Sequence, residues 1–168
     1  MRKKSHPLEV ISRLSTDMGL VDLSENFGRY IPPSNERKPM GSEISQKWLE
    51  RVVYDLDTAK AMLQTGRLIY AVFMCQQCLE KCFKALLAYQ NKEIVPLHSL
   101  RRLTELTETI SELDEPLLMK LDFLSRYYIS ARYKEDLDQL SREITEPVAR
   151  DFIQFSEELI TWLCQKMI

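Results

Sequence analysis

Glycine and proline are scarce in this chain of 168 residues, which has four glycines and seven prolines. They are also unevenly placed, because only Gly66, Pro96, Pro116 and Pro147 lie beyond residue 41. A β-sandwich or an α/β sheet needs many more turn residues than this, so both are excluded over most of the chain. Glycine-rich phosphate loops are excluded too, since neither the GxGxxG nor the GxxxxGK pattern occurs.

A strong charge of one sign and a long apolar run are also lacking. The formal net charge is −2, so any contact with RNA would need a local basic patch rather than a general basic field. No apolar run approaches the roughly 20 residues of a membrane span. The basic start Met1-Arg2-Lys3-Lys4 is not followed by the apolar stretch of a signal peptide. We therefore expect a cytoplasmic protein that does not contact a membrane.

Histidine is rare, since only His6 and His98 are present. This matters for whether the four cysteines could bind a metal ion. Three cysteines share one face of a predicted helix, at Cys75, Cys78 and Cys82. Zinc-binding CxxC pairs usually occur twice or with well-spaced histidines, and neither arrangement is found. The spacing therefore favours small apolar side chains in a core, and we expect no metal and no cofactor.

Apolar residues repeat at helical spacing through most of the chain beyond residue 44. The predicted helices run over about 45–64, 67–90, 100–110, from 116 to beyond 128, and from about 146 onward. Gly66 is placed to end the first helix, Ser99 to cap the third, and the prolines to begin the last two. The second helix is apolar almost all round, which is typical of the central helix of a bundle. The chain is thus predicted to be an all-α bundle of about five helices, residues 45–168, behind an N-terminal arm, residues 1–44.

One polar strip interrupts the second predicted helix. Its sequence is Gln76-Gln77-x-x-Glu80-Lys81-x-x-Lys84, and Glu80 and Lys84 have the spacing and order of a favourable helical ion pair. The simpler interpretation is a solvated strip on an otherwise buried helix. The alternative is that the strip contributes to a ligand site.

A second polar concentration spans residues 126–136, at the predicted end of the fourth helix and beyond it. It contains two arginines and three tyrosines, at Arg126, Arg132, Tyr127, Tyr128 and Tyr133. Such side chains could bind phosphate and stack on bases. They could equally have a structural role at the end of the helix. The arginines would then lie near its negative end, and the tyrosines would cover the edge of the bundle.

A series of motifs runs in order through about residues 45–165. It reads Trp48…Asp55-Leu56-x-x-Ala59, Gly66-x-x-x-x-Ala71-x-Phe73-x-x-Gln76-Gln77-x-x-Glu80-Lys81-x-x-Lys84-Ala85-Leu86-Leu87, His98-Ser99-Leu100 and Tyr128-x-x-x-Arg132-Tyr133. The Gln-Gln-x-x-Glu-Lys-x-x-Lys-Ala block is fairly specific, and its combination with the distant Arg-Tyr pair is more so. Together these motifs resemble the HEPN domain.

The resemblance implies an up-and-down antiparallel bundle that forms a homodimer. Many HEPN domains are metal-independent ribonucleases, often toxins paired with a small nucleotidyltransferase antitoxin. Others bind RNA or nucleotides without catalysis, or are helical partners of nucleotidyltransferases. The nuclease motif is an arginine followed a few residues later by a histidine, in which the histidine moves the 2′-hydroxyl proton and the arginine holds the phosphate.

This sequence departs from the nuclease motif. Arg132 aligns with the motif arginine, but no histidine follows it anywhere in the chain. His98 matches the histidine that precedes the third helix in the family, where it helps to shape the helix start. We therefore predict a module that binds nucleotide or RNA, or pairs with a nucleotidyltransferase in a toxin–antitoxin-like context, and that is not an enzyme.

Phosphate contact is assigned to Arg132, Lys134 and Arg126. Tyr128 and Tyr133 are expected to stack on a base or to fix the loop. Four further residues are expected to orient the binding residues without contacting the ligand themselves, namely Gln77, Glu80, Lys84 and His98.

Two alternatives stay open at this point. One is a divergent ribonuclease toxin that uses Arg132. The other is a pure protein-interaction module that uses the N-terminal arm and a second apolar face of the last helix, marked by Ile153 and Ile160.

Overall fold

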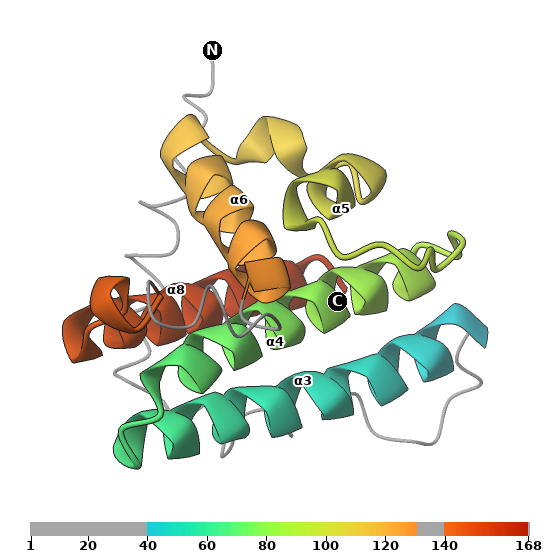
Figure 1. Cartoon of the computed structure of the whole chain (residues 1–168). Helices are drawn as coiled ribbons and strands as arrows, with labels where there is room; N and C mark the ends of the chain where they lie inside the picture. The colour runs from blue at the N-terminus through green and yellow to red at the C-terminus, as the bar shows by residue number, and fades with distance from the viewer. Residues whose placement is uncertain (1–39, 131–139, 168) are drawn as a thin grey trace.

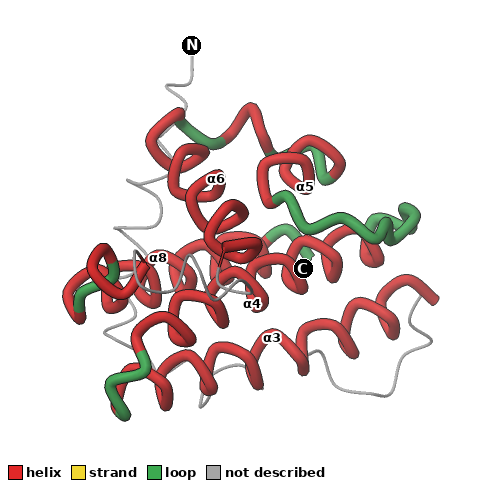
Figure 2. The backbone as a smooth tube through the Cα atoms, in the orientation of Figure 1, coloured by secondary structure: helices red, strands yellow, loops and turns green. Residues whose placement is uncertain are grey.

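The computed structural model describes residues 40–130 and 140–167, and within these ranges every regular element is a helix (Figures 1 and 2). The elements are α3 (Met40–Gln64), α4 (Leu68–Tyr89), α5 (Leu100–Leu106), the short 3₁₀ helix η1 (Ile110–Glu112), α6 (Glu115–Ser130) and α8 (Glu146–Gln165). Residues 140–143 are helical as well. The predicted all-α bundle is confirmed.

Helix α4 is the centre of the bundle. It packs against α3, α8, α5 and α6, and 14 of its 22 residues are buried. Figure 1 shows α3 and α8 running alongside α4, while α6 crosses over it at a steep angle. The prediction of a central second helix is therefore confirmed, and most of what is polar on α4 has to find a partner inside the protein.

The turn between α3 and α4 depends on Gly66. This residue has a φ of +70°, and its N–H donates to Leu63 O at 3.0 Å while Arg67 N–H donates to Met62 O at 2.8 Å. These bonds satisfy carbonyls that the end of a helix leaves without partners. No atom lies within 4 Å of a Cβ built on Gly66, so its backbone conformation, rather than crowding, favours glycine here.

Helix α5 begins as the sequence predicts and ends earlier. Ser99 Oγ accepts a hydrogen bond from Arg102 N–H at 3.4 Å, as expected of an N-cap. The helix stops at Leu106, whereas the apolar pattern predicted a continuation to about residue 110. Glu108 adopts a left-handed φ of 61°, which a continuing helix cannot contain, and η1 follows it.

The apolar face marked by Ile153 and Ile160 does not exist as an exposed surface. These side chains are 6% and 1% exposed, so the prediction that they form an outer face is wrong. The physical reason is that α8 packs against both α4 and α3, which buries more than one side of the helix.

The cysteines behave as core residues. All four are free and buried, and burial raises the pKa of Cys75 to about 12. The prediction that Cys75, Cys78 and Cys82 pack as small apolar side chains is confirmed. None of the helices in the described ranges combines the length and apolarity needed to cross a membrane.

The predicted boundary between arm and bundle stays a prediction. Helix α3 begins at Met40, a little before the expected start near residue 45. Residues 1–39 lie outside the described part of the chain.

Candidate functional site

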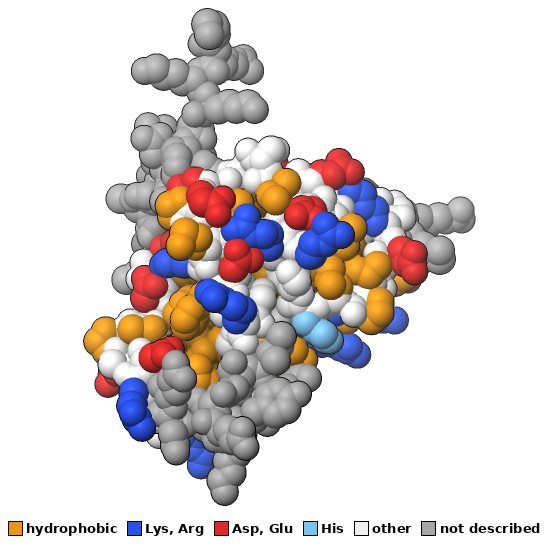
Figure 3. Space-filling model, turned by 45° about the horizontal axis from the view of Figure 1, so that its top comes forward, with side chains coloured by type: hydrophobic (Ala, Val, Ile, Leu, Met, Phe, Trp, Pro, Cys, Tyr) orange, Lys and Arg blue, Asp and Glu red, His pale blue; other side chains and the backbone are white. Residues whose placement is uncertain are grey.

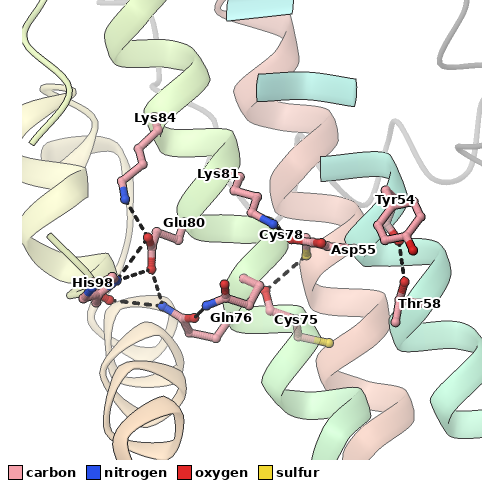
Figure 4. Close-up of polar contacts among 11 residues, drawn as sticks. Tyr54, Asp55, Thr58, Cys75, Gln76, Cys78, Glu80, Lys81, Lys84 and His98 are labelled. Carbon is pink, nitrogen blue, oxygen red and sulfur yellow. Dashed lines mark hydrogen bonds and ion pairs between the residues drawn. The ribbon is translucent and has the colours of Figure 1, made fainter. Parts of the chain in front are cut away.

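Three polar residues of the strip on α4 are buried side by side. Gln76, Glu80 and Lys84 are 0%, 6% and 7% exposed, and their four-residue spacing places them on one face of the helix. His98, from the segment before α5, reaches the same face (Figure 4). We call these four residues the Glu80 cluster. For its three α4 members the interpretation as a solvated strip is wrong. His98 lies against Gln76 and Glu80, and Lys84 Nζ lies 5.8 Å from the ring of Trp48 on α3.

Glu80 is the hub of this cluster. Lys84 Nζ donates to its Oε1 at 2.6 Å, which confirms the predicted ion pair, and Gln76 Nε2 donates to its Oε2 at 3.0 Å. His98 Nδ1 lies 3.0 Å from Oε2 and 3.2 Å from Oε1. Burial alone would raise the pKa of Glu80, but the hydrogen bonds from Lys84, Gln76 and His98 outweigh it and lower that pKa below its usual value. Glu80 is therefore a carboxylate at neutral pH.

His98 is held at three points. Its Nδ1 contacts Glu80, its backbone carbonyl accepts a hydrogen bond from Gln76 Nε2 at 3.2 Å, and its ring lies 5.1 Å from the ring of Tyr128. Tyr128 in turn stacks on Phe73 at 5.4 Å. The side chain of His98 is nevertheless 54% exposed. A half-exposed imidazole is thus held in place by buried groups.

A second buried carboxylate joins α4 to α3. Asp55 is 4% exposed and forms an ion pair with Lys81. Burial raises the pKa of Asp55, and the attraction of Lys81 and Arg51 only partly opposes it. This pair was not predicted, although one signal was available: Asp55 lies among the regularly spaced apolar residues Val52, Leu56 and Ala59. Its position between two core helices indicates a structural role.

The predicted binding residues fall into two groups. Arg132, Tyr133 and Lys134 lie outside the described residues, so their predicted roles stay predictions. Arg126 is exposed on α6, and no ion pair joins it to any residue of 40–130 or 140–167. Tyr128 is buried, and its ring lies against Phe73 and His98.

Two further residues support the bundle. Gln77 donates to Gln76 Oε1 at 2.6 Å and so completes the hydrogen bonding of that buried amide. Tyr127, which had no individual role in the prediction, is buried and donates its hydroxyl to Ile69 O at 3.4 Å. It seals the junction of α6 and α4, as the structural interpretation of these tyrosines proposed.

Charges on the surface around α5 and α6 largely neutralise one another. Acidic and basic side chains are interspersed over this face (Figure 3). Arg101 pairs with both Asp122 and Glu115, and Lys120 pairs with Asp151 across to α8. Within the described ranges, no three His, Cys, Asp or Glu side chains are grouped in a way that could hold a metal ion. The cluster around His98 is held together by hydrogen bonds, an ion pair and an aromatic contact.

The family model of the HEPN domain matches residues 45–167. The chain belongs to the HEPN family. At the level of the family, the HEPN domain is a nucleotide- or RNA-related module, or one associated with nucleotidyltransferases.

A solved structure shows the same HEPN fold. The crystal structure of TT1696 from Thermus thermophilus superposes with a TM-score of 0.63 and 23% sequence identity, over 73% of this chain and 97% of that one. At this identity the similarity shows the fold alone. No curated protein matches the chain.

Proposed function

We propose that this HEPN domain binds RNA or nucleotides without cleaving them, at a site where the end of α6 meets the Glu80 cluster. The observation that carries the proposal is the fixed, half-exposed imidazole of His98 against Tyr128. Tyr128 lies in the last turn of α6, and the sequence continues from there to Arg132 and Lys134. A polar side chain that is held in place on the surface, and whose neighbour Tyr128 precedes arginine and lysine in the sequence, supports a ligand site here.

The charges of the region support phosphate as the group that is bound. Arg101 and Lys120 are neutralised by carboxylates. Arg126 has no such partner among the described residues. Arg132 and Lys134 add two further positive charges close by in the sequence. Arginine is well suited to phosphate because its planar guanidinium donates two parallel hydrogen bonds.

We propose binding without cleavage because the nuclease motif is incomplete in this sequence. In the family that motif needs a histidine shortly after the arginine, and this sequence has none after Arg132. His98 precedes α5 and is held by Glu80, so it does not occupy the motif position.

Arg132→Ala tests the proposal. We expect the variant to bind a fluorescently labelled single-stranded RNA about tenfold or more weakly than the wild type, because a charge-assisted hydrogen bond contributes about 1.5–3 kcal/mol. The measurement is fluorescence anisotropy, with ATP as an unlabelled competitor. The melting temperature should change little, because the proposal assigns Arg132 to the ligand and not to the core of the bundle.

Arg150→Ala is the matched control. Arg150 is exposed on α8 and pairs only with Glu146, one turn away on the same helix, among the described residues. The control should bind RNA like the wild type. Unchanged binding by Arg132→Ala, or a wild-type protein that binds neither RNA nor ATP, would contradict the proposal.

A further inference from the structure

The proton on His98 can be placed from its contacts. A carboxylate only accepts hydrogen bonds, so the nitrogen that faces Glu80 must donate. That nitrogen is Nδ1, which lies 3.0 Å from Oε2. In the neutral ring the other nitrogen, Nε2, then carries no proton and is a hydrogen-bond acceptor. No hydrogen bond joins Nε2 to any residue in the described ranges.

Lys84 shares the carboxylate of Glu80 with His98. Lys84 Nζ lies 2.6 Å from the same carboxylate, so one positive charge already balances Glu80. In its neutral form, the imidazole offers the solvent a lone pair on Nε2, in an orientation set by Glu80 and Tyr128.

An Nε2 that carries no proton can bind the hydrogen-bond donors of a nucleotide but not its acceptors. Phosphate oxygens are acceptors at neutral pH and gain nothing from another acceptor. The ribose 2′-hydroxyl is a donor, and it is the group by which a protein distinguishes RNA from DNA. Resting on the proposed function, we infer that His98 Nε2 accepts a hydrogen bond from a ribose 2′-hydroxyl and so makes this domain prefer RNA over DNA.

In this arrangement Glu80 is a positioning residue. It does not reach the ligand, because it is buried beneath the imidazole, but it fixes which nitrogen of His98 carries the proton. Replacement by glutamine would remove that control, since a side-chain amide can either donate to Nδ1 or accept from it. Tyr128 supports the flat face of the ring and limits its rotation.

The test compares three ligands of one sequence composed of A, C and G: RNA, 2′-O-methyl RNA and DNA. For the wild type, fluorescence anisotropy should give binding to RNA about threefold to tenfold tighter than to the other two, which is the range of one neutral hydrogen bond. His98→Ala should bind all three alike, at the level of the wild type with DNA. Arg132→Ala should weaken RNA and DNA by the same factor, because both ligands carry the same phosphates.

A spectroscopic measurement on the wild type tests the inference even if a variant does not fold. In the ¹⁵N spectrum of the wild-type imidazole we expect a protonated Nδ1 and a bare Nε2, with the Nε2 signal moving when RNA is added and not when DNA is added. Glu80→Gln should contain a larger share of the opposite tautomer and a reduced preference for RNA. An Nε2–H tautomer in the wild type would overturn the inference.

The two proposals fail in different ways. Equal binding of RNA and DNA by the wild type, or an equal loss for both ligands in His98→Ala, would overturn the role of His98 and leave the proposed binding intact. A wild-type protein that binds none of the three ligands would overturn the proposed function itself.

Discussion

Two carboxylates are buried among the described residues, Glu80 and Asp55, and their pKa values are shifted in opposite directions. The pKa of Glu80 is lowered by its three donors, whereas burial raises the pKa of Asp55 in spite of Lys81. Glu80 therefore stabilises the fold as a carboxylate, and Asp55 is held in a site that favours its neutral form.

This difference predicts the effects of two isosteric substitutions at pH 7. Glu80→Gln should lower the free energy of unfolding by about 2–3 kcal/mol, because it leaves the buried Lys84 without a counter-charge. Asp55→Asn should change it by less than about 1 kcal/mol, since the amide oxygen still accepts from Lys81, and Lys81 is partly exposed to solvent. Urea unfolding of the two variants and the wild type measures both effects.

The pH dependence checks the sign of each effect. A lowered pKa means that the contribution of Glu80 is present above its ordinary value of 4.5 and is lost as the pH falls through the folded value. The difference in the free energy of unfolding between the wild type and Glu80→Gln should therefore become smaller toward pH 3. For Asp55, the raised pKa means that the neutral acid stabilises below 3.8 and that this contribution is lost at higher pH. A Glu80→Gln deficit that grows on acidification would contradict the account.

At the scale of elements, the local signals in the sequence were sufficient where one residue decides a helix end. Gly66 stops α3, Ser99 caps α5, and Pro147 lies in the first turn of α8. Each of these depends on the backbone within a few residues, so the sequence alone predicts it. The end of α5 was not predictable in this way, because the apolar pattern continues past the point where Glu108 takes a left-handed conformation.

Gly66 gives a prediction at this scale. Gly66→Ala should lower the free energy of unfolding by about 1 kcal/mol, because alanine is strained at a positive φ. Gly66→Asn should lower it less, since asparagine tolerates this conformation. Because no atom crowds a Cβ at this position, the loss reflects the backbone alone. Thermal unfolding of the two variants makes the comparison, and an equal loss in both would contradict it.

At the scale of the whole molecule, α4 carries polar contacts on two sides. Asp55 and Lys81, 26 residues apart, join it to α3, while Glu80 and His98, 18 residues apart, join it to the segment before α5. Contacts at such separations depend on how the chain returns over α4, which periodicity does not report. The sequence therefore predicted the polar strip and named Glu80, Lys84 and His98. It could not tell that three residues of the strip are buried, or that Glu80 orients an imidazole.

The central claim is that this HEPN domain binds RNA and leaves it intact. The most direct measurement is to incubate the wild-type protein with end-labelled single-stranded RNA and to resolve one half on a native gel and the other on a denaturing gel. The account predicts a retarded band on the native gel, weakened in Arg132→Ala, and full-length RNA on the denaturing gel. RNA that is not retarded, or shortened products that end in 2′,3′-cyclic phosphate, would contradict it.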